Sequence, residues 1–77
     1  MIVATNRFLY LVRRRWVVVM QTDFEHPERI HAKMLTDWLA SNITGVYDVF
    51  PTAHSRRWRA EFESEEDSLL CYLRWSA

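Results

Sequence analysis

The segment from Arg56 to Trp75 constrains the fold of this chain more than any other stretch, because two regular patterns follow each other in it. Charged and apolar side chains alternate over residues 57–63, which is the period expected of a strand with one buried face. Ser64 and the three carboxylates after it suit a helix N-terminus, where a hydroxyl accepts from a free amide and the dipole favours negative charge. The segment predicts a strand leading directly into a helix, and its apolar strand positions are Trp58, Ala60 and Phe62.

Two further elements are predicted before this segment. The run from Arg15 to Thr22 is rich in β-branched residues and apolar on both faces, which favours a central strand or one used in an interface. Pro27 suits the first position of a helix that ends near Ser41 or Asn42, before the single glycine. Its apolar stripe has helical spacing and comprises Ile30, Met34, Leu35, Trp38, Leu39 and Ile43.

A second strand is predicted over residues 45–50, followed by a loop over residues 51–55 that makes an antiparallel hairpin with the strand after it. In the last helix, Leu69, Leu70 and Leu73 are expected to form the buried stripe, with Tyr72 and Trp75 beside it.

The order strand, helix, strand, strand, helix predicts an α+β fold, a small two-layer sandwich with both helices on one face of the sheet. The opposite sheet face should be only partly polar, and its candidate residues are Val17, Val19, Tyr47, Val49, Arg57 and Arg59.

The first 14 residues are predicted to form an N-terminal arm or an edge strand, and residues 15–77 a single domain. The stretch from Phe8 to Val12 suits a short strand, but Arg13 and Arg14 would then make the reversal without Gly, Asn or Pro. An extended arm or one long bent strand is the alternative. Such an arm could be disordered, cover the domain's own sheet, or pair with a second copy of the chain.

Composition excludes several classes of function. A chain of 77 residues forms one domain that buries only about 60% of its unfolded surface. Its formal net charge is zero, so bulk charge gives no argument for nucleic-acid binding. The single cysteine favours a reducing compartment, and we expect a cytoplasmic protein. No apolar run reaches the roughly 18 residues of a membrane span, no signal peptide is recognisable, and one glycine cannot build a phosphate-binding loop.

The residues with chemical potential are better explained by structure, so we predict no catalytic, cofactor or metal site and no enzyme. His26, His31, His54 and Cys71 have the atom types of a zinc site, but their spacing matches no known ligand pattern. Cys71 reads as a small, partly buried, inert thiol rather than a nucleophile. The carboxylates after Ser64 are accounted for by helix capping.

Three short motifs carry a resemblance to a group of known proteins. The ending F-E-S-E-E-D-S-L-L-C-Y-L-R-W, together with W-V-V-V and D-W-L, resembles small uncharacterised proteins of tailed bacteriophages. The resemblance covers residues 15–75. It implies a phage origin and with it a place in the host cytoplasm, but no activity; many such proteins have no assigned function, and those with a known role often bind a host protein. No functional residue is carried over from it.

The surplus of large apolar residues, including four Trp, favours a non-enzymatic protein-binding module that self-associates as a homodimer through its N-terminal segment or a sheet edge. Trp38 and Trp58 are expected in the core. The predicted partner-binding residues are Tyr10, Leu11, Arg13, Arg14, Arg15, Trp16 and Trp75. The alternative is a nucleic-acid-binding module that uses Arg13, Arg14, Arg15, Arg56, Arg57 and Arg59 beside an aromatic residue.

Overall fold

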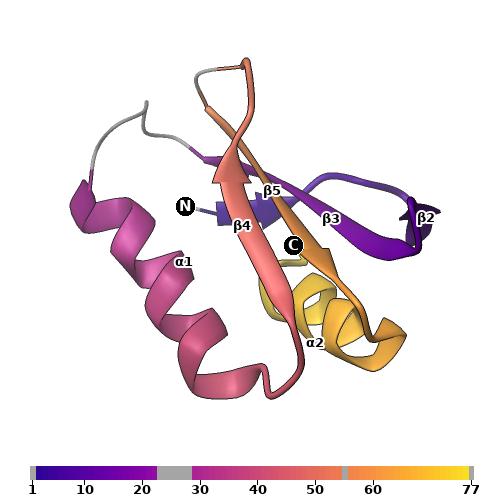
Figure 1. Ribbon diagram of the computed structural model, residues 1–77. Helices are drawn as coiled ribbons and strands as arrows, with labels where there is room; N and C mark the ends of the chain where they lie inside the picture. Colours follow the sequence, from indigo (N-terminus) through magenta and orange to yellow (C-terminus); the bar gives the residue numbers. More distant parts are fainter. Residues whose placement is uncertain (1, 23–28, 55, 77) are drawn as a thin grey trace.

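The computed structural model describes residues 2–22, 29–54 and 56–76, with residues 29–32 described by their backbone alone. An antiparallel sheet and two helices give the α+β fold expected from the sequence (Figure 1). The elements are β1 (Ile2–Ala4), β2 (Tyr10–Val12), β3 (Arg15–Thr22), α1 (Arg29–Asn42), β4 (Tyr47–Pro51), β5 (Arg57–Phe62) and α2 (Glu65–Trp75).

β3 is the central strand of the sheet. The strand order is β1-β3-β5-β4, and all these neighbours are antiparallel. β3 and β4 therefore run parallel with β5 between them, which is a split β-α-β arrangement around α1. The other edge of β3 is shared, since β1 pairs with its C-terminal half and β2 with its N-terminal half. The N-terminal segment thus lies along one strand as two short pieces.

The predicted junction of strand and helix is confirmed at both of its parts. In β5, Ala60 and Phe62 are fully buried and face the helices, and their partners across the ladder are Val18 and Trp16 of β3. The Ser64 Oγ accepts from the backbone N–H of Asp67 at 3.4 Å and caps α2. Full burial of a side chain such as that of Phe62 stabilises the fold by roughly 1.5–3 kcal/mol.

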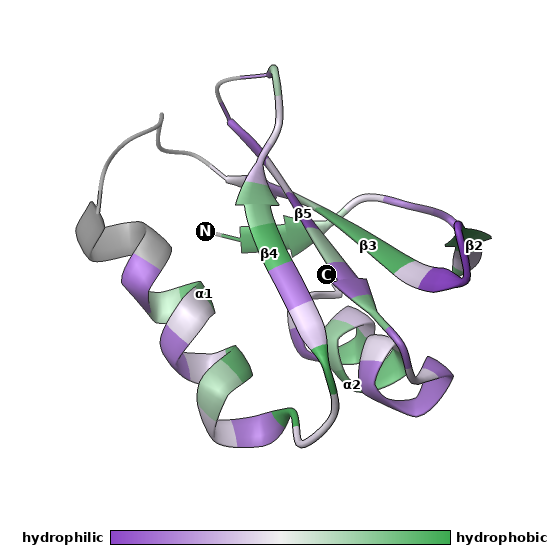
Figure 2. Cartoon of the chain, in the orientation of Figure 1, coloured by the Kyte–Doolittle hydropathy of each residue, from purple (hydrophilic) through white to green (hydrophobic). Residues whose placement is uncertain are grey.

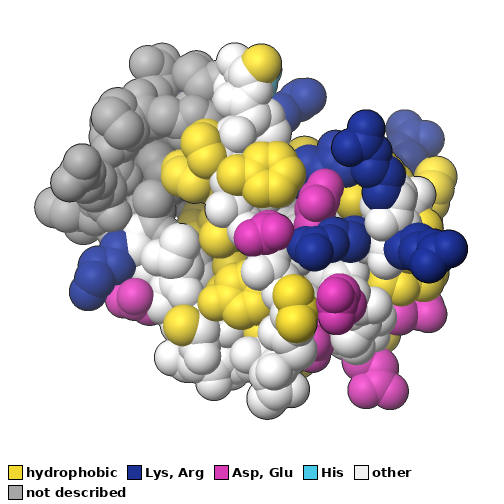
Figure 3. Space-filling view, in the orientation of Figure 1, with side chains coloured by type: hydrophobic (Ala, Val, Ile, Leu, Met, Phe, Trp, Pro, Cys, Tyr) yellow, Lys and Arg dark blue, Asp and Glu magenta, His cyan; other side chains and the backbone are white. Residues whose placement is uncertain are grey.

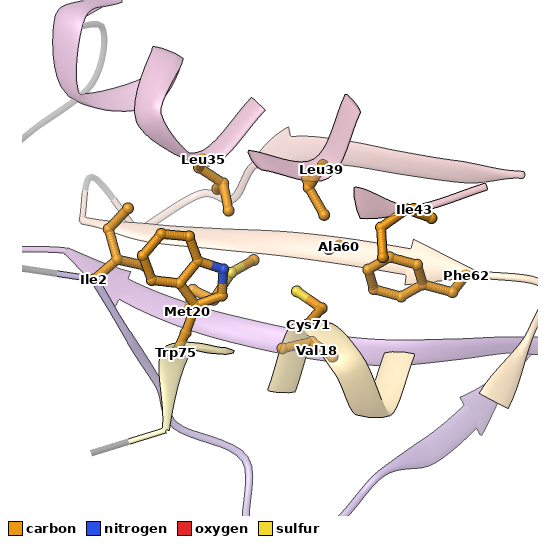
Figure 4. Packing of buried hydrophobic residues seen from close by; sticks show 10 residues of the cluster. All are labelled: Ile2, Val18, Met20, Leu35, Leu39, Ile43, Ala60, Phe62, Cys71 and Trp75. Carbon is orange, nitrogen blue, oxygen red and sulfur yellow. The ribbon is translucent and has the colours of Figure 1, made fainter. Parts of the chain in front are cut away.

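One hydrophobic core lies between the sheet and the two helices. Figure 4 shows α1 and α2 contributing side chains to the same cluster as the strands. The two helices also meet directly, because the rings of Trp38 and Trp75 pack edge to face with centroids 6.0 Å apart. Members of the cluster are Ile2, Val18, Met20, Leu35, Leu39, Ile43, Ala60, Phe62, Cys71 and Trp75.

The rotation of α2 differs from the prediction. Leu69, Leu70 and Leu73 are not buried, with exposed fractions of 46%, 45% and 61%. The buried residues of α2 are Ser68, Cys71 and Trp75.

Asp67 explains why the helix has this rotation. Only residues 63 and 64 separate α2 from β5, so the helix cannot turn freely about its axis. The Asp67 Oδ2 also accepts a hydrogen bond from the backbone N–H of Gly45 at 3.2 Å. A Cβ built at position 45 would come within 2.6 Å of the same oxygen. The hydrogen bond holds one flank of α2 against the loop before β4, and a side chain at position 45 would displace the Asp67 carboxylate from it.

The remaining differences concern single positions. Tyr47 and Val49 pack against the core rather than on the outer sheet face, because their β5 partners are Phe62 and Ala60. The outer face does carry Val17, Val19, Arg57 and Arg59, as predicted. In α1, Met34 is 59% exposed although it was expected in the buried stripe. The predicted start of this helix at Pro27 lies outside the described residues.

Candidate functional site

The reversal between β2 and β3 is a tight hairpin rather than an extended arm or a bent strand. Val12 pairs with Arg15, which leaves Arg13 and Arg14 as the two turn residues. Their φ angles are 53° and 67°, so both adopt the left-handed conformation that a type I′ turn requires. This conformation costs roughly 1–2 kcal/mol for each residue with a side chain. The fold therefore holds two arginines at the tip of a strained turn.

Charged residues surround this turn on the outer face of the sheet. Arg15 Nη1 lies 3.0 Å from Asp48 Oδ2, and Arg59 Nε lies 2.9 Å from Glu61 Oε2. Within the described part of the chain, Arg13 and Arg14 have no acidic partner. Figure 3 shows basic and acidic side chains interspersed on one side of the visible face, and Figure 2 shows the turn as strongly hydrophilic.

A concave site of about 370 Å³ lies beside the turn. It is lined by Val12, Arg13, Arg15, Arg59 and Glu61. The arginines outnumber the acidic group, so the site is suited to anionic groups, although Glu61 and the Arg15 pair with Asp48 reduce its positive charge. We call the turn and this concavity the basic hairpin.

The six arginines of the nucleic-acid alternative do not converge. Arg57 pairs in register with Gln21, and its Nε donates to the Gln21 side chain at 3.0 Å. Gln21 lies six residues along β3 from Arg15, which corresponds to roughly 20 Å at the rise of a β-strand. Arg56 precedes β5 at that same end of the sheet. Of the six, Arg13, Arg15 and Arg59 line the concave site beside the turn.

The predicted partner-binding residues also separate. Leu11 is 55% exposed, whereas Tyr10 and Trp16 are half-buried and Trp16 packs against the core. Trp75 is only 6% exposed, so it is a core residue and is not available to a partner. Its place was misjudged for the same reason as the leucines, since both depend on the rotation of α2.

Asn6 is a structural residue that the sequence reading missed. Its Oδ1 accepts from the Val19 N–H at 3.2 Å, and its Nδ2 donates to the Val17 carbonyl at 3.2 Å. The Thr5 N–H donates to the Val19 carbonyl at 2.8 Å. The carboxamide thus replaces a backbone partner where residues 5–9 loop away from β3 between β1 and β2. An Asn inside a largely apolar segment was the available signal.

The exposed leucines of α2 form the second surface of interest. Leu69, Leu70 and Leu73 lie at helical spacing on the side of α2 away from its buried residues. Exposure of three adjacent leucines in a helix of this length is unusual for the free surface of a small domain. We call these three residues the leucine stripe. No sequence signal separated them from the core, because α2 has two apolar stripes.

Of the candidates for chemistry, the structure describes the side chains of Cys71 and His54. Cys71 is fully buried, and burial raises the pKa of its thiol to about 12, so it stays protonated at neutral pH. His54 is exposed, and its Nδ1 accepts from the Arg56 N–H at 3.2 Å. His26 and the His31 side chain lie outside what is described. Among the described residues, no three His, Cys, Asp or Glu side chains are close enough to hold a metal ion.

Neither α1 nor α2, as far as the structure describes them, is long and apolar enough to cross a membrane. Comparison of the chain with protein-family models, with curated proteins and with solved structures gave no match.

Proposed function

We propose that this protein is a non-enzymatic protein-binding module that self-associates and presents an apolar helix face to its partners. The leucine stripe is the observation that carries the proposal. Leucines at 45–61% exposure hold apolar area in water, and a partner that covers them gains roughly 25 cal/mol for each Å² removed from water. Leu11 on β2 adds a further apolar residue at 55% exposure.

The partner class follows from the resemblance to small tailed-bacteriophage proteins, which implies a target in the host cell. We propose that a host protein occupies an apolar surface of the module. The predicted partner-binding residues Tyr10, Leu11 and Trp16 form the part of the proposed binding surface that comes from the N-terminal segment and β3. In the C-terminal helix, the leucine stripe takes the place of Trp75 in the proposal.

Affinity capture from a bacterial host lysate tests protein binding. The wild-type chain and the variants Leu73→Glu and Met34→Glu would be immobilised in parallel. Leu73 and Met34 are exposed to a similar extent, at 61% and 59%, but only Leu73 belongs to the leucine stripe. We expect one protein to be retained by wild type and Met34→Glu and lost with Leu73→Glu. Equal retention by all three chains would contradict a role for the stripe.

A nucleic-acid-binding module is the second candidate function, and the basic hairpin favours it. Two arginines held in left-handed conformation, with no acidic partner among the described residues, are a costly arrangement that selection for binding would explain. Their guanidinium groups match phosphate geometry.

Fluorescence anisotropy with a labelled single-stranded oligonucleotide tests this second function. If it is correct, binding weakens as salt rises, and Arg13→Gln with Arg14→Gln lowers both the affinity and the salt dependence. The control is Arg74→Gln on α2, which should bind as wild type does. Absence of salt-sensitive binding at low ionic strength would dispose of the candidate.

A further inference from the structure

The charges around the leucine stripe are arranged symmetrically along α2. Glu66, Leu70 and Arg74 recur every four residues and therefore lie in one row along the helix. Glu66 and Arg74 are both exposed, with Leu70 midway between them. The row is acidic at the N-terminal end, apolar in the middle and basic at the C-terminal end.

A row of this kind is complementary to itself when it is reversed. A two-fold axis through Leu70 places Glu66 of each copy opposite Arg74 of the other copy, so the dimer has two such pairs. It also brings the stripe leucines of both copies together and aligns the helix dipoles antiparallel, which is their favourable arrangement. A parallel arrangement would instead oppose Glu66 to Glu66 and Arg74 to Arg74.

The position of Arg74 supports its availability for such a pair. Its guanidinium carbon lies 4.2 Å from the ring centroid of Trp75, so the side chain is held on the surface of α2. A guanidinium stacked on an aromatic ring still has its N–H groups free at the edge, where a carboxylate can bind. Among the described residues, Arg74 has no acidic partner within its own chain.

We propose that a second copy of this chain covers the leucine stripe, in a two-fold symmetric dimer whose α2 helices pack antiparallel about Leu70. This inference rests on the proposed self-association and names its surface, α2, in place of the N-terminal segment or a sheet edge. A stable complex buries about 800 Å² for each partner. One helix face supplies less than that, so the dimer is weak and reversible, and a host protein that binds the leucine stripe competes with the second copy for it.

Disulfide trapping tests the position of the axis. In Leu70→Cys the two new thiols face each other across the axis, and mild oxidation should give a covalent dimer on a non-reducing gel. The wild-type chain is the first control, because its only cysteine, Cys71, is buried and should not cross-link. Met34→Cys is the second, since it places a thiol at a position of 59% exposure, against 45% for Leu70, on α1 and away from the proposed axis.

Charge reversal tests the antiparallel direction by sedimentation equilibrium. Glu66→Arg or Arg74→Glu alone places like charges opposite each other at both ends and should raise the dissociation constant by about tenfold. The double variant restores both pairs in reversed order and should return the constant to near the wild-type value. In a parallel dimer neither single reversal would have this effect.

The possible outcomes distinguish the α2 dimer from the broader proposal of self-association. A wild-type chain that stays monomeric at high micromolar concentration overturns both self-association and the α2 dimer. A wild-type dimer that Leu70→Cys does not trap, and whose affinity the double reversal does not rescue, overturns the α2 dimer and leaves self-association through another surface. Circular dichroism of each variant excludes loss of folding as the cause.

Discussion

At the scale of single residues, two buried or half-buried groups have roles that their identity alone does not reveal. Asn6 replaces a backbone partner for β3, and Cys71 fills the core as an apolar group. Each role follows from the surroundings of the side chain, and each gives a measurable prediction.

Replacement of Asn6 by Ala should lower the free energy of unfolding by about 1–3 kcal/mol, because the Val17 carbonyl and the Val19 N–H lose their partner. Urea denaturation measures the loss, and amide hydrogen exchange should become faster at Val19. Asn42→Ala is the control, since its Nδ2 donates to the Trp38 carbonyl at the exposed end of α1. A variant as stable as this control would contradict the role of Asn6 in the sheet.

The raised pKa of Cys71 makes stability depend on alkaline pH. Its pKa moves from 9.0 to about 12 on burial, so between these values the unfolded chain releases the proton and the folded chain keeps it. The free energy of unfolding should therefore fall as pH rises through this window, by at most about 1.4 kcal/mol per pH unit. Below pH 9.0 the group should have little effect.

Urea denaturation at about pH 7.5 and about pH 10 measures this dependence, with Cys71→Ala as the reference. All other ionisable groups are the same in both chains, so the difference between them isolates the thiol. We expect wild type to lose more stability than the variant on the alkaline side. Identical losses would mean that the thiol ionises as easily in the folded chain as in the unfolded one.

At the scale of elements, the β2–β3 hairpin and α2 each follow local sequence preferences in most of their residues and depart from them at a few positions. The hairpin keeps good strand pairing but has arginine where Asn-Gly is preferred. The helix has its predicted cap and start, but its leucines are exposed. Both exceptions lie on the surface and both concern residues of the proposed binding surfaces, which is where departures from local preference are expected in a functional protein.

Substitution of Arg13 by Asn and Arg14 by Gly should stabilise the protein by about 1–2 kcal/mol, because both new residues accept positive φ more readily. The midpoint of urea denaturation should rise without a change in slope. Arg7→Asn, another exposed arginine of the N-terminal segment but outside the turn, should have no such effect. An unchanged midpoint in the double variant would show that the turn carries no strain.

At the scale of the whole molecule, the N-terminal segment and the rest of the chain share one core. Ile2 of β1 is a member of the cluster that includes Met20 and Trp75. The expected boundary between an arm of residues 1–14 and a domain of residues 15–77 stays a prediction. The contribution of Ile2 to the free energy of unfolding measures whether the arm folds as part of the domain.

Ile2→Ala should cost about 2 kcal/mol, at the low end of buried Ile-to-Ala changes because the residue is near the chain end. This is a large share of the roughly 4–12 kcal/mol expected for a domain of this size. Val3→Ala is the matched control, since Val3 is half-buried and points to the other face of the sheet. Equal, small losses of stability in both variants would mean that the segment behaves as an independent arm.

Much of the fold could be predicted from the sequence because the relevant forces are local. Alternation identified β5, a hydroxyl followed by carboxylates identified the start of α2, and the β-branched run identified β3. The candidate site was predicted less well. The arginines of the turn were singled out, but their division between two ends of the sheet depends on strand register, which local patterns do not specify.

The sequence by itself determined β3, α1, β4, β5 and α2 and their order, but it did not resolve the N-terminal segment into β1 and β2. Only the tertiary structure decided which face of α2 is buried and how residues 13 and 14 reverse the chain. A helix with two apolar stripes has two acceptable rotations, and the bond from Asp67 to Gly45 together with a two-residue link from β5 selects one of them. Pairing along β3 likewise overrides the preference of arginine against positive φ, because the N-terminal half of the β3 edge gains β2 as a partner when the turn closes.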